Sequence, residues 1–305
     1  MKISVFGLGY VGITTASCFA ALGNQVYGID INPERVKSIS EGHSPIQIGG
    51  IDELLKKQID TKRLVATTNY EDVLNKTNIS FVCVQTPCKA DGDLDLTALN
   101  RVCVQIGSVL GRRGPLYHTV VIRSTVFPGT LNRLEKILEG HSGLKTHEGF
   151  GLAVNPEFLR EAYAVEDFFN PPYVVVGSNS QEDAEEVMGV YSGVSAKKLI
   201  VKPDVAQIIK YVNNSWHANK VAFTNEIGYL CNSLGINPTE VMEVFKQDHK
   251  LNISEYYHKP GHAYGGHCLP KDLSVLQSRA RAIGLTVPLI DSISKSNELQ
   301  VKRDK

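Results

Sequence analysis

A cysteine that could act as a nucleophile lies in the segment Gly265-Gly266-His267-Cys268-Leu269-Pro270-Lys271-Asp272. Two glycines allow the backbone to turn sharply before the thiol, and a proline suited to the first position of a helix follows it. If Pro270 opens a helix, Cys268 lies at its positive end, where unpaired amides, with His267 and Lys271, would lower the thiol pKa. The segment therefore predicts a reactive thiolate, and the alternative is an ordinary loop cysteine.

A glycine-rich turn near the amino end predicts a dinucleotide site. The apolar pattern around it indicates strand, turn, helix and strand at residues 2–6, 7–12, 13–22 and 25–29. In this GxGxxG pattern Gly7 permits a tight turn, Gly9 lets the backbone approach a pyrophosphate, and Gly12 allows close packing of helix on strand. This context favours a dinucleotide over the alternative, a purely structural glycine turn.

Asp30 follows the second of these strands, about 20 residues after the glycine turn, as the fingerprint requires. A carboxylate at this place accepts hydrogen bonds from ribose hydroxyls and repels a 2′-phosphate, so the sequence predicts NAD rather than NADP. Arg35, close behind, tempers that preference because an arginine can accommodate the phosphate.

The alternation continues and predicts an α/β fold, a Rossmann-like, doubly wound, largely parallel sheet. Further strands are expected at residues 63–67, 79–84, 119–124, 152–155, 173–176 and 199–202. Ligands bind at the carboxyl ends of such strands, so the segments 84–87, 123–126 and 155–161 are candidates for the site. Turn residues at strand ends are also typical of a plain scaffold.

Apolar residues recur at three- to four-residue steps from Asp204 to Leu234 and predict one long amphipathic helix. That helix would place Lys210 and Asn214 on one face, where an ammonium and a carboxamide could converge on one oxygen. The alternative is a solvated lysine beside an ordinary asparagine. Shorter helices are expected from residues 237, 270 and 287. The sequence thus divides into a Rossmann-like domain at 1–202 and an all-helical domain at 203–305.

Composition argues against several classes of partner. The 305 residues include 32 basic and 32 acidic side chains, and this balance argues against a nucleic-acid or membrane-binding surface. The six cysteines lack the paired spacings of a disulfide framework, which favours free thiols in a cytoplasmic protein. An uncharged run at residues 3–29 could pass for a membrane segment, but its glycines favour the nucleotide fold.

Taken together, these motifs resemble the UDP-glucose/GDP-mannose dehydrogenase family, most closely its branch that oxidises GDP-mannose. The matching segments are FGLGYVG at 6–12, STVFPGT at 124–130, NPEFLRE at 155–161, Lys210 with Asn214, QDHKLNIS at 247–254 and GGHCLPKD at 265–272. Six motifs in order along the whole chain are far more specific than any one of them.

The resemblance implies a four-electron oxidation, in which the primary alcohol of a nucleotide sugar loses two hydrides to two NAD molecules and becomes a uronic acid. By this analogy a base at Asp272 and Lys210 helps remove the hydroxyl proton. Cys268 then adds to the resulting aldehyde, giving a thiohemiacetal that loses the second hydride and becomes a thioester.

The same resemblance implies roles for further residues. Lys210 and Asn214 would hold the oxyanion, and Glu157 or Glu161, with Thr125, would activate the hydrolytic water. The implied NAD contacts are Gly7, Gly9, Tyr10, Val11, Gly12, Asp30, Arg35, Thr86, Thr125 and Lys271. The implied substrate contacts are Glu157, Phe158, Leu159, Arg160, Lys210, Asn214, His217, Tyr256, Tyr257, Lys259 and Gly265. No metal is expected.

A homodimer built on residues 203–305 is expected from the apolar stripe of the long helix and from the resemblance, with Tyr256, Tyr257 and Lys259 reaching the partner's site. Family members continue into a second nucleotide-binding domain, whereas this sequence stops at Lys305. The 305 residues alone are therefore expected to bind NAD but to oxidise nucleotide sugars poorly.

Several alternatives stay open at the level of sequence. His267 stands where glucose and mannose enzymes carry a small residue or tyrosine, and it is similar to the UDP-N-acetylmannosamine branch; UDP-glucose is another candidate substrate. Lys259 replaces an arginine of the GDP-mannose branch and cannot make the same bidentate contacts. The rival functions are a metal cluster of His258, His262, His267 and Cys268, a β-hydroxyacid dehydrogenase, and an NAD-binding remnant without turnover.

Overall fold

The computed structural model describes residues 1–46, 49–90, 92–114, 116–254, 256–257, 262–266 and 268–304, with the backbone alone for Glu161. The chain forms two compact units, residues 1–212 and 213–305. The predicted domain boundary at 202/203 falls where the long helix begins, whereas the compact units divide within that helix.

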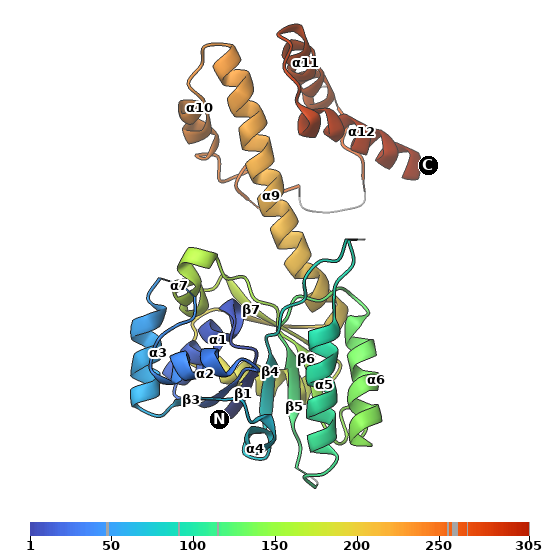
Figure 1. Cartoon of the computed structure of the whole chain (residues 1–305). Helices are drawn as coiled ribbons and strands as arrows, with labels where there is room; N and C mark the ends of the chain where they lie inside the picture. Colours follow the sequence, from blue (N-terminus) through green and yellow to red (C-terminus); the bar gives the residue numbers. More distant parts are fainter. Residues whose placement is uncertain are drawn as a thin grey trace. The chain divides into compact units, whose positions relative to one another are not determined.

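The first unit is an α/β fold around one eight-stranded sheet of order β3-β2-β1-β4-β5-β6-β7-β8 (Figure 1). Its strands are β1 (Lys2–Phe6), β2 (Gln25–Ile29), β3 (Leu64–Thr67), β4 (Ile79–Val82), β5 (Thr119–Ile122), β6 (Gly151–Val154), β7 (Tyr173–Ser178) and β8 (Lys197–Val201). All neighbours pair in parallel except β6 and β7, which are antiparallel. The predicted doubly wound, largely parallel sheet is confirmed.

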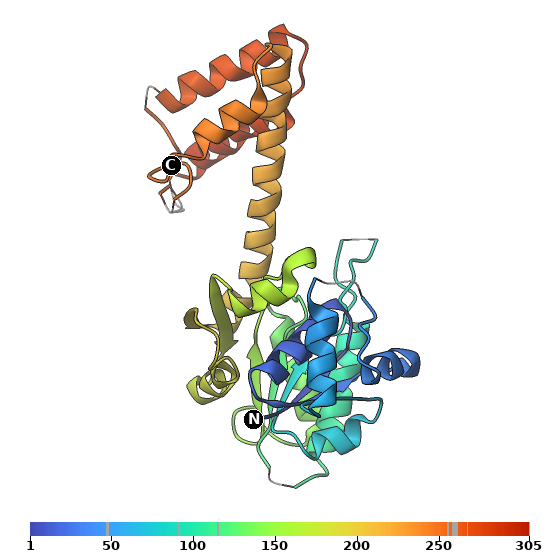
Figure 2. The ribbon, with the colours of Figure 1, turned by 90° about the vertical axis from the view of Figure 1, so that its left-hand side faces the viewer.

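Helices cover both faces of this sheet (Figures 1 and 2). They are α1 (Tyr10–Ala21), α2 (Pro33–Ser40), α3 (Ile51–Asp60), α4 (Tyr70–Leu74), α5 (Thr97–Leu110), α6 (Thr130–Ser142), the 3-10 helix η1 (Glu161–Tyr163), α7 (Ala164–Phe169) and α8 (Gln181–Val190). Side chains alternate along β1, so Ile3 and Val5 pack with α1, α3, α7 and α8, while Phe6 packs with α4, α5 and α6. The central strands β1, β4, β5 and β6 are therefore buried on both faces, as parallel strands between helix layers require.

The order of the strands creates one place suited to a ligand. After β1 the chain builds β2 and β3 towards one edge, and it then returns to lay β4 on the other side of β1. The carboxyl ends of β1 and β4 thus mark the point where the strand order reverses, and doubly wound folds bind their ligands at that point.

Helix α1 begins at Tyr10, three residues earlier than the sequence pattern predicted. The predicted turn at 7–12 is therefore shorter, because the second half of the GxGxxG motif already has helical geometry. Gly9 is the N-cap, and the helix has neither a side-chain cap nor an acidic residue in its first turn. The first amides of a helix lack intrahelical partners, so this end of α1 can receive an anion.

The second unit is helical, and α9 (Pro203–Ser233) is one continuous helix that starts in the first unit, as predicted. It is followed by α10 (Pro238–Phe245), α11 (Cys268–Ala282) and α12 (Pro288–Arg303). Helix α11 begins at Cys268 and not at Pro270, since proline is tolerated throughout a first turn in which amides have no partner. None of the described helices is both long and apolar enough to span a membrane.

Candidate functional site

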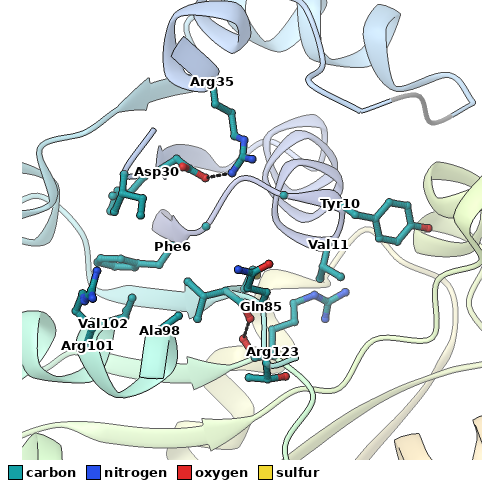
Figure 3. A pocket seen from close by; sticks show the side chains of 18 of the residues that line it. Phe6, Tyr10, Val11, Asp30, Arg35, Gln85, Ala98, Arg101, Val102 and Arg123 are labelled. Atoms are coloured by element: carbon teal, nitrogen blue, oxygen red, sulfur yellow. Dashed lines mark hydrogen bonds and ion pairs between the residues drawn. The ribbon is translucent and has the colours of Figure 1, made fainter. Parts of the chain in front are cut away.

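A cavity of about 620 Å³ opens at the carboxyl ends of β1, β4 and β5 in the first unit (Figure 3). It is lined by most of the residues that the sequence predicted to bind NAD: Gly7, Gly9, Tyr10, Val11, Asp30, Arg35, Thr86 and Thr125. Gly12 does not line it, and Lys271 belongs to the other unit. The fold therefore gathers eight of the ten predicted cofactor residues around one volume.

The three glycines of the motif serve different steric needs. Gly7 has a φ of +84°, a conformation that favours glycine. A Cβ at Gly12 would lie 1.7 Å from the carbonyl oxygen of Gly7, so no side chain fits there. A Cβ at Gly9 would meet no atom within 4 Å. Since the protein itself does not require glycine at position 9, the open space beside this backbone fits the approach of a dinucleotide pyrophosphate.

Asp30 links the glycine turn to the end of β2. Its Oδ2 accepts hydrogen bonds from the Leu8 amide at 2.8 Å and from Arg35 Nη1 at 3.0 Å, and its Oδ1 accepts from the Asn32 amide at 2.9 Å. The side chain is only 4% exposed, yet it lines the cavity. A carboxylate can accept about four hydrogen bonds, so Asp30 can still accept one from a ribose hydroxyl while it holds the turn.

Two hydroxyl groups fasten the loops at the other end of the cavity. Thr86 Oγ1 donates to the carbonyl of Thr125 at 2.7 Å, and Ser124 Oγ donates to the carbonyl of Val84 at 2.6 Å. These bonds join the loop after β4 to the loop after β5. They keep Thr125 at the cavity wall, and the family resemblance predicted that this residue contacts both the cofactor and the hydrolytic water.

Lys210 and Glu157 form an ion pair that the sequence pattern did not predict. Their side chains, 12% and 10% exposed, place Nζ 2.7 Å from Oε1. The second oxygen of Glu157 accepts from the Leu159 amide at 2.7 Å, and Lys210 lies 5.9 Å from the ring centre of Phe158. Glu157 also lines the cavity. The structure thus joins the expected oxyanion holder to an expected water-activating carboxylate.

Arg123 is a further residue at the cavity wall whose side chain the sequence did not single out. It is 4% exposed and donates from Nε to Thr15 Oγ1 at 2.9 Å. Its Nη1 donates to Asn155 Oδ1 at 2.7 Å and to Tyr191 Oη at 2.9 Å. A buried cation held by neutral oxygens links the loops that carry Thr125 and Glu157. Its only signal in the sequence was its position near the carboxyl end of the predicted strand 119–124, in the candidate segment 123–126.

Other predicted substrate residues of the first unit are engaged within the protein. Arg160 forms a two-point ion pair with Asp167, with Nη2–Oδ1 at 2.6 Å and Nε–Oδ2 at 3.0 Å. Phe158 packs edge-on against Tyr173, and Leu159 packs against the core. These residues shape the loop after β6. The side chain of Glu161, the other predicted carboxylate, lies outside the described residues.

The remaining predicted residues belong to the helical unit. Cys268 is exposed at the first position of α11, and Lys271 and Asp272 form an ion pair of 3.2 Å in the same helix. Asn214 and His217 are exposed on α9, and Gly265 is exposed in the loop before α11. Tyr256 and Tyr257 are exposed with their rings in edge contact. Lys259, and His258 and His267 of the suggested metal cluster, lie outside the described residues. Among the described residues, no three His, Cys, Asp or Glu side chains could hold a metal together.

Comparison with known proteins identifies both units. Residues 1–195 match the NAD binding domain of the UDP-glucose/GDP-mannose dehydrogenase family, and residues 204–299 match the central domain of that family. GDP-mannose 6-dehydrogenase of Pseudomonas syringae pv. syringae is 45% identical over 305 residues, which is 99% of this chain and 69% of that protein. UDP-glucose 6-dehydrogenase AglM of Haloferax volcanii is 34% identical over 99% of this chain and 71% of that protein.

Solved structures agree with these sequence matches. A ternary complex of GDP-mannose dehydrogenase from Pseudomonas aeruginosa superposes with a TM-score of 0.97 at 42% identity, covering 99% of this chain and 70% of that one. A UDP-glucose dehydrogenase from Pyrobaculum islandicum gives a TM-score of 0.77 at 35% identity, covering 97% and 68%. The chain therefore belongs to the UDP-glucose/GDP-mannose dehydrogenase family, and it is an oxidoreductase that uses NAD.

Proposed function

We propose that this protein oxidises a nucleotide sugar of the GDP-mannose type to the corresponding uronic acid, with two NAD molecules as hydride acceptors. The choice of sugar rests on the difference in similarity between this chain and the two kinds of enzyme. Identity is 45% to a GDP-mannose 6-dehydrogenase but 34% to a UDP-glucose 6-dehydrogenase, and each match covers 99% of the chain. The TM-scores fall in the same order, from 0.97 to 0.77.

In the first half of the proposed reaction the primary alcohol becomes an aldehyde. The hydroxyl proton passes to a base, for which Asp272 with Lys210 is the candidate pair, and the carbon-bound hydrogen leaves as hydride. NAD supplies the hydride acceptor when it is bound. The ammonium of Lys210 would stabilise the developing alkoxide, and Glu157, 2.7 Å away, would orient that ammonium.

In the second half Cys268 would act as the nucleophile. Its thiolate adds to the aldehyde carbon, and the former carbonyl oxygen takes a proton to complete a thiohemiacetal. Loss of that proton and of a second hydride gives a thioester. Water then attacks the thioester, with Glu157 or Glu161 as base, and releases the acid and the thiolate. The exposure of Cys268 in the first turn of α11 supports this role, since the free amides there favour negative charge.

Replacing the proposed nucleophile tests this mechanism. In Cys268→Ser acid formation should fall by at least about a thousandfold, while NAD affinity stays unchanged, because covalent catalysis is lost and the cofactor cavity is intact. The measurement is NADH and acid formed per sugar, with NAD affinity determined by calorimetry. Cys88→Ser is the matched control, since Cys88 is also exposed but lies on the loop after β4. Two NADH per sugar from Cys268→Ser would refute the covalent route.

A substrate panel tests the choice of sugar. GDP-mannose should give the highest kcat/KM, ahead of UDP-glucose and UDP-N-acetylmannosamine. A preference for either UDP sugar would overturn the assignment. Release of a single NADH with a β-hydroxyacid would favour the one-hydride alternative, and NAD binding without turnover of any sugar would favour the remnant.

We also propose that the helical unit forms a homodimer. Among its described residues many apolar side chains are exposed, for example Val221, Tyr229 and Val244. The apolar core of this unit is small and leaves these side chains unburied. The mass of one chain is 33.5 kDa, and light scattering at micromolar concentration should return twice that value. A monomer mass would contradict the proposal.

A further inference from the structure

We infer that Asn297 of α12 positions the loop that carries Cys268 and thereby sets the rate of aldehyde oxidation, a role that rests on the function proposed above. Asn297 Oδ1 accepts a hydrogen bond from the Tyr264 amide at 2.8 Å. Asn297 Nδ2 donates to the Tyr264 carbonyl at 2.9 Å. One partly buried carboxamide therefore binds both backbone groups of a residue four positions before the thiol.

A second side chain from the end of α12 strengthens this attachment. Asp304, the C-cap residue of α12, accepts from the Ala263 amide through Oδ2 at 2.9 Å. Gln300, one turn earlier, donates to the other oxygen of Asp304 at 2.6 Å. Two consecutive residues of the loop are thus held by the last turns of one helix.

Helix α12 is itself fixed at its amino end. Glu226 of α9 accepts from the amides of Leu289 at 2.8 Å and Ile290 at 3.0 Å, and this carboxylate is 8% exposed. Gln277 of α11 donates to the carbonyl of Ile290 at 3.0 Å and to Ser294 Oγ at 3.1 Å. Because α12 binds both the body of α11 and the loop before it, α12 acts as a rigid frame for the segment that contains Cys268.

The attachment lies directly before two glycines of the loop, Gly265 and Gly266. A Cβ at Gly265 or Gly266 would meet no atom within 4 Å, and Gly266 has a φ of +81°. Packing therefore does not restrain these two glycines, and glycine has the largest conformational freedom of any residue. Tyr264 is held on one side of these glycines, and α11 follows on the other. Without Asn297, the freedom of the glycines would extend further back along the chain.

The two halves of the reaction depend differently on this restraint. Addition to the aldehyde requires the sulfur to meet the carbon at a short distance and a defined angle, and displacement by about 1 Å can reduce a rate by about 100-fold. Transfer of the first hydride from the alcohol does not involve the thiol. A loosened loop should therefore slow aldehyde oxidation and spare alcohol oxidation.

The test is Asn297→Leu, which keeps the approximate size of the side chain and removes both hydrogen bonds. Alcohol oxidation is measured with the nucleotide sugar plus semicarbazide, which traps the aldehyde after one NADH. Aldehyde oxidation is measured with the nucleotide-sugar aldehyde as substrate. We expect aldehyde oxidation to fall about 10- to 100-fold, with alcohol oxidation and NAD affinity within about twofold of the native values. Glu298→Gln, at the adjacent exposed position of α12, is the control and should change neither rate.

Equal losses in both halves would indicate general disruption and would overturn the inference, as would two native rates. Asn297→Asp guards against misfolding of the leucine variant, because aspartate keeps the acceptor for the Tyr264 amide and loses the donor. It should give the same selective loss, and a native aldehyde rate would count against a role for the carboxamide. Cys268→Ser is assayed in parallel. Acid formation by that variant would reject the proposed mechanism, whereas an inactive Cys268→Ser beside a native Asn297→Leu would reject only the positioning role.

Discussion

The NAD-binding unit and the helical unit differ in how they are held together. In the first unit two apolar cores lie on the two faces of the sheet, and Phe6, Phe19, Phe81 and Phe150 are fully buried. In the described part of the helical unit the apolar core contains four buried residues, Leu230, Ala280, Val287 and Ile290. A sheet covered by helices on both faces can bury its own surface, whereas a few helices with one small core depend on other interactions.

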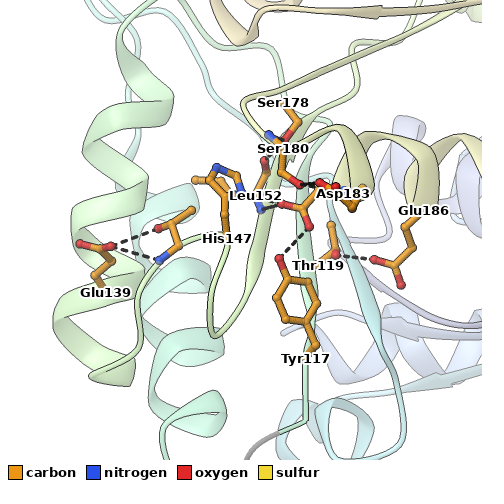
Figure 4. Close-up of polar contacts among 11 residues, drawn as sticks. Tyr117, Thr119, Glu139, His147, Leu152, Ser178, Ser180, Asp183 and Glu186 are labelled. Carbon is orange, nitrogen blue, oxygen red and sulfur yellow. Dashed lines mark hydrogen bonds and ion pairs between the residues drawn. The ribbon is translucent and has the colours of Figure 1, made fainter.

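Polar contacts show the same contrast. In the first unit, a polar cluster around the buried Asp183 joins elements that apolar packing already holds (Figure 4). Tyr117 Oη donates to its Oδ1 at 2.8 Å, and His147 Nδ1 lies 2.6 Å from its Oδ2. In the helical unit, Glu226 and Asn297 connect helices and loops that share little apolar surface. Loss of close packing should therefore harm the first unit most, and loss of single polar contacts should harm the second.

The largest effect is expected from Gly12→Ala. The added Cβ would lie 1.7 Å from the Gly7 carbonyl oxygen, so the glycine turn must move. We expect a loss of about 3 kcal/mol or more in the free energy of unfolding, together with loss of NAD binding. Urea unfolding and NAD titration measure these two effects. Gly265→Ala is the matched control in the helical unit, where the Cβ has free space, and it should change stability by less than about 0.5 kcal/mol.

A smaller effect is expected from acid in the first unit, through His118. Burial, and then the charge of Arg113, lower the pKa of His118 to about 3. The unfolded state therefore binds the proton more tightly, and stability that is complete above pH 6.5 is lost as the pH falls towards 3. Between pH 7.5 and pH 5 this group should cost about 2 kcal/mol.

Urea unfolding of native protein and His118→Gln at the two pH values measures this cost. The native protein should lose about 2 kcal/mol more than the variant on acidification, because glutamine does not titrate. His217→Gln, at an exposed position of α9, should keep the native pH dependence. Equal pH dependence in native and His118→Gln proteins would show that His118 is not the responsible group.

The smallest of these effects is expected from Glu226→Ala in the helical unit. The substitution removes the acceptor for two amides at the start of α12, and loss of such a cap costs about 1 to 2 kcal/mol. Because the apolar core nearby is small, the loss should appear as faster amide exchange throughout α12. Exchange measured by mass spectrometry should leave α5 of the first unit unchanged. Native exchange in α12 would show that apolar packing alone holds that helix.

Much of the fold was predictable from local patterns. Strand positions were correct within two residues because buried parallel strands read as short apolar runs. The antiparallel pairing of β6 with β7 was not predictable, because strand direction depends on the path of the connecting segment. The early start of α1 at Tyr10 was also missed, because Gly12 lies inside the first turn and glycine has a low intrinsic helix propensity.

The sequence by itself determined the dinucleotide turn, the helix that carries Lys210, and the placement of Cys268 at the start of a helix, because spacing and periodicity along the chain encode these features. Only the tertiary structure decided which side chains meet. Lys210 pairs with Glu157 across 53 residues, and Asn297 binds Tyr264 across 33. Asp30 holds the Leu8 amide as well as facing the cavity. Such partners are chosen by the packing of distant elements, and local sequence carries no record of that geometry.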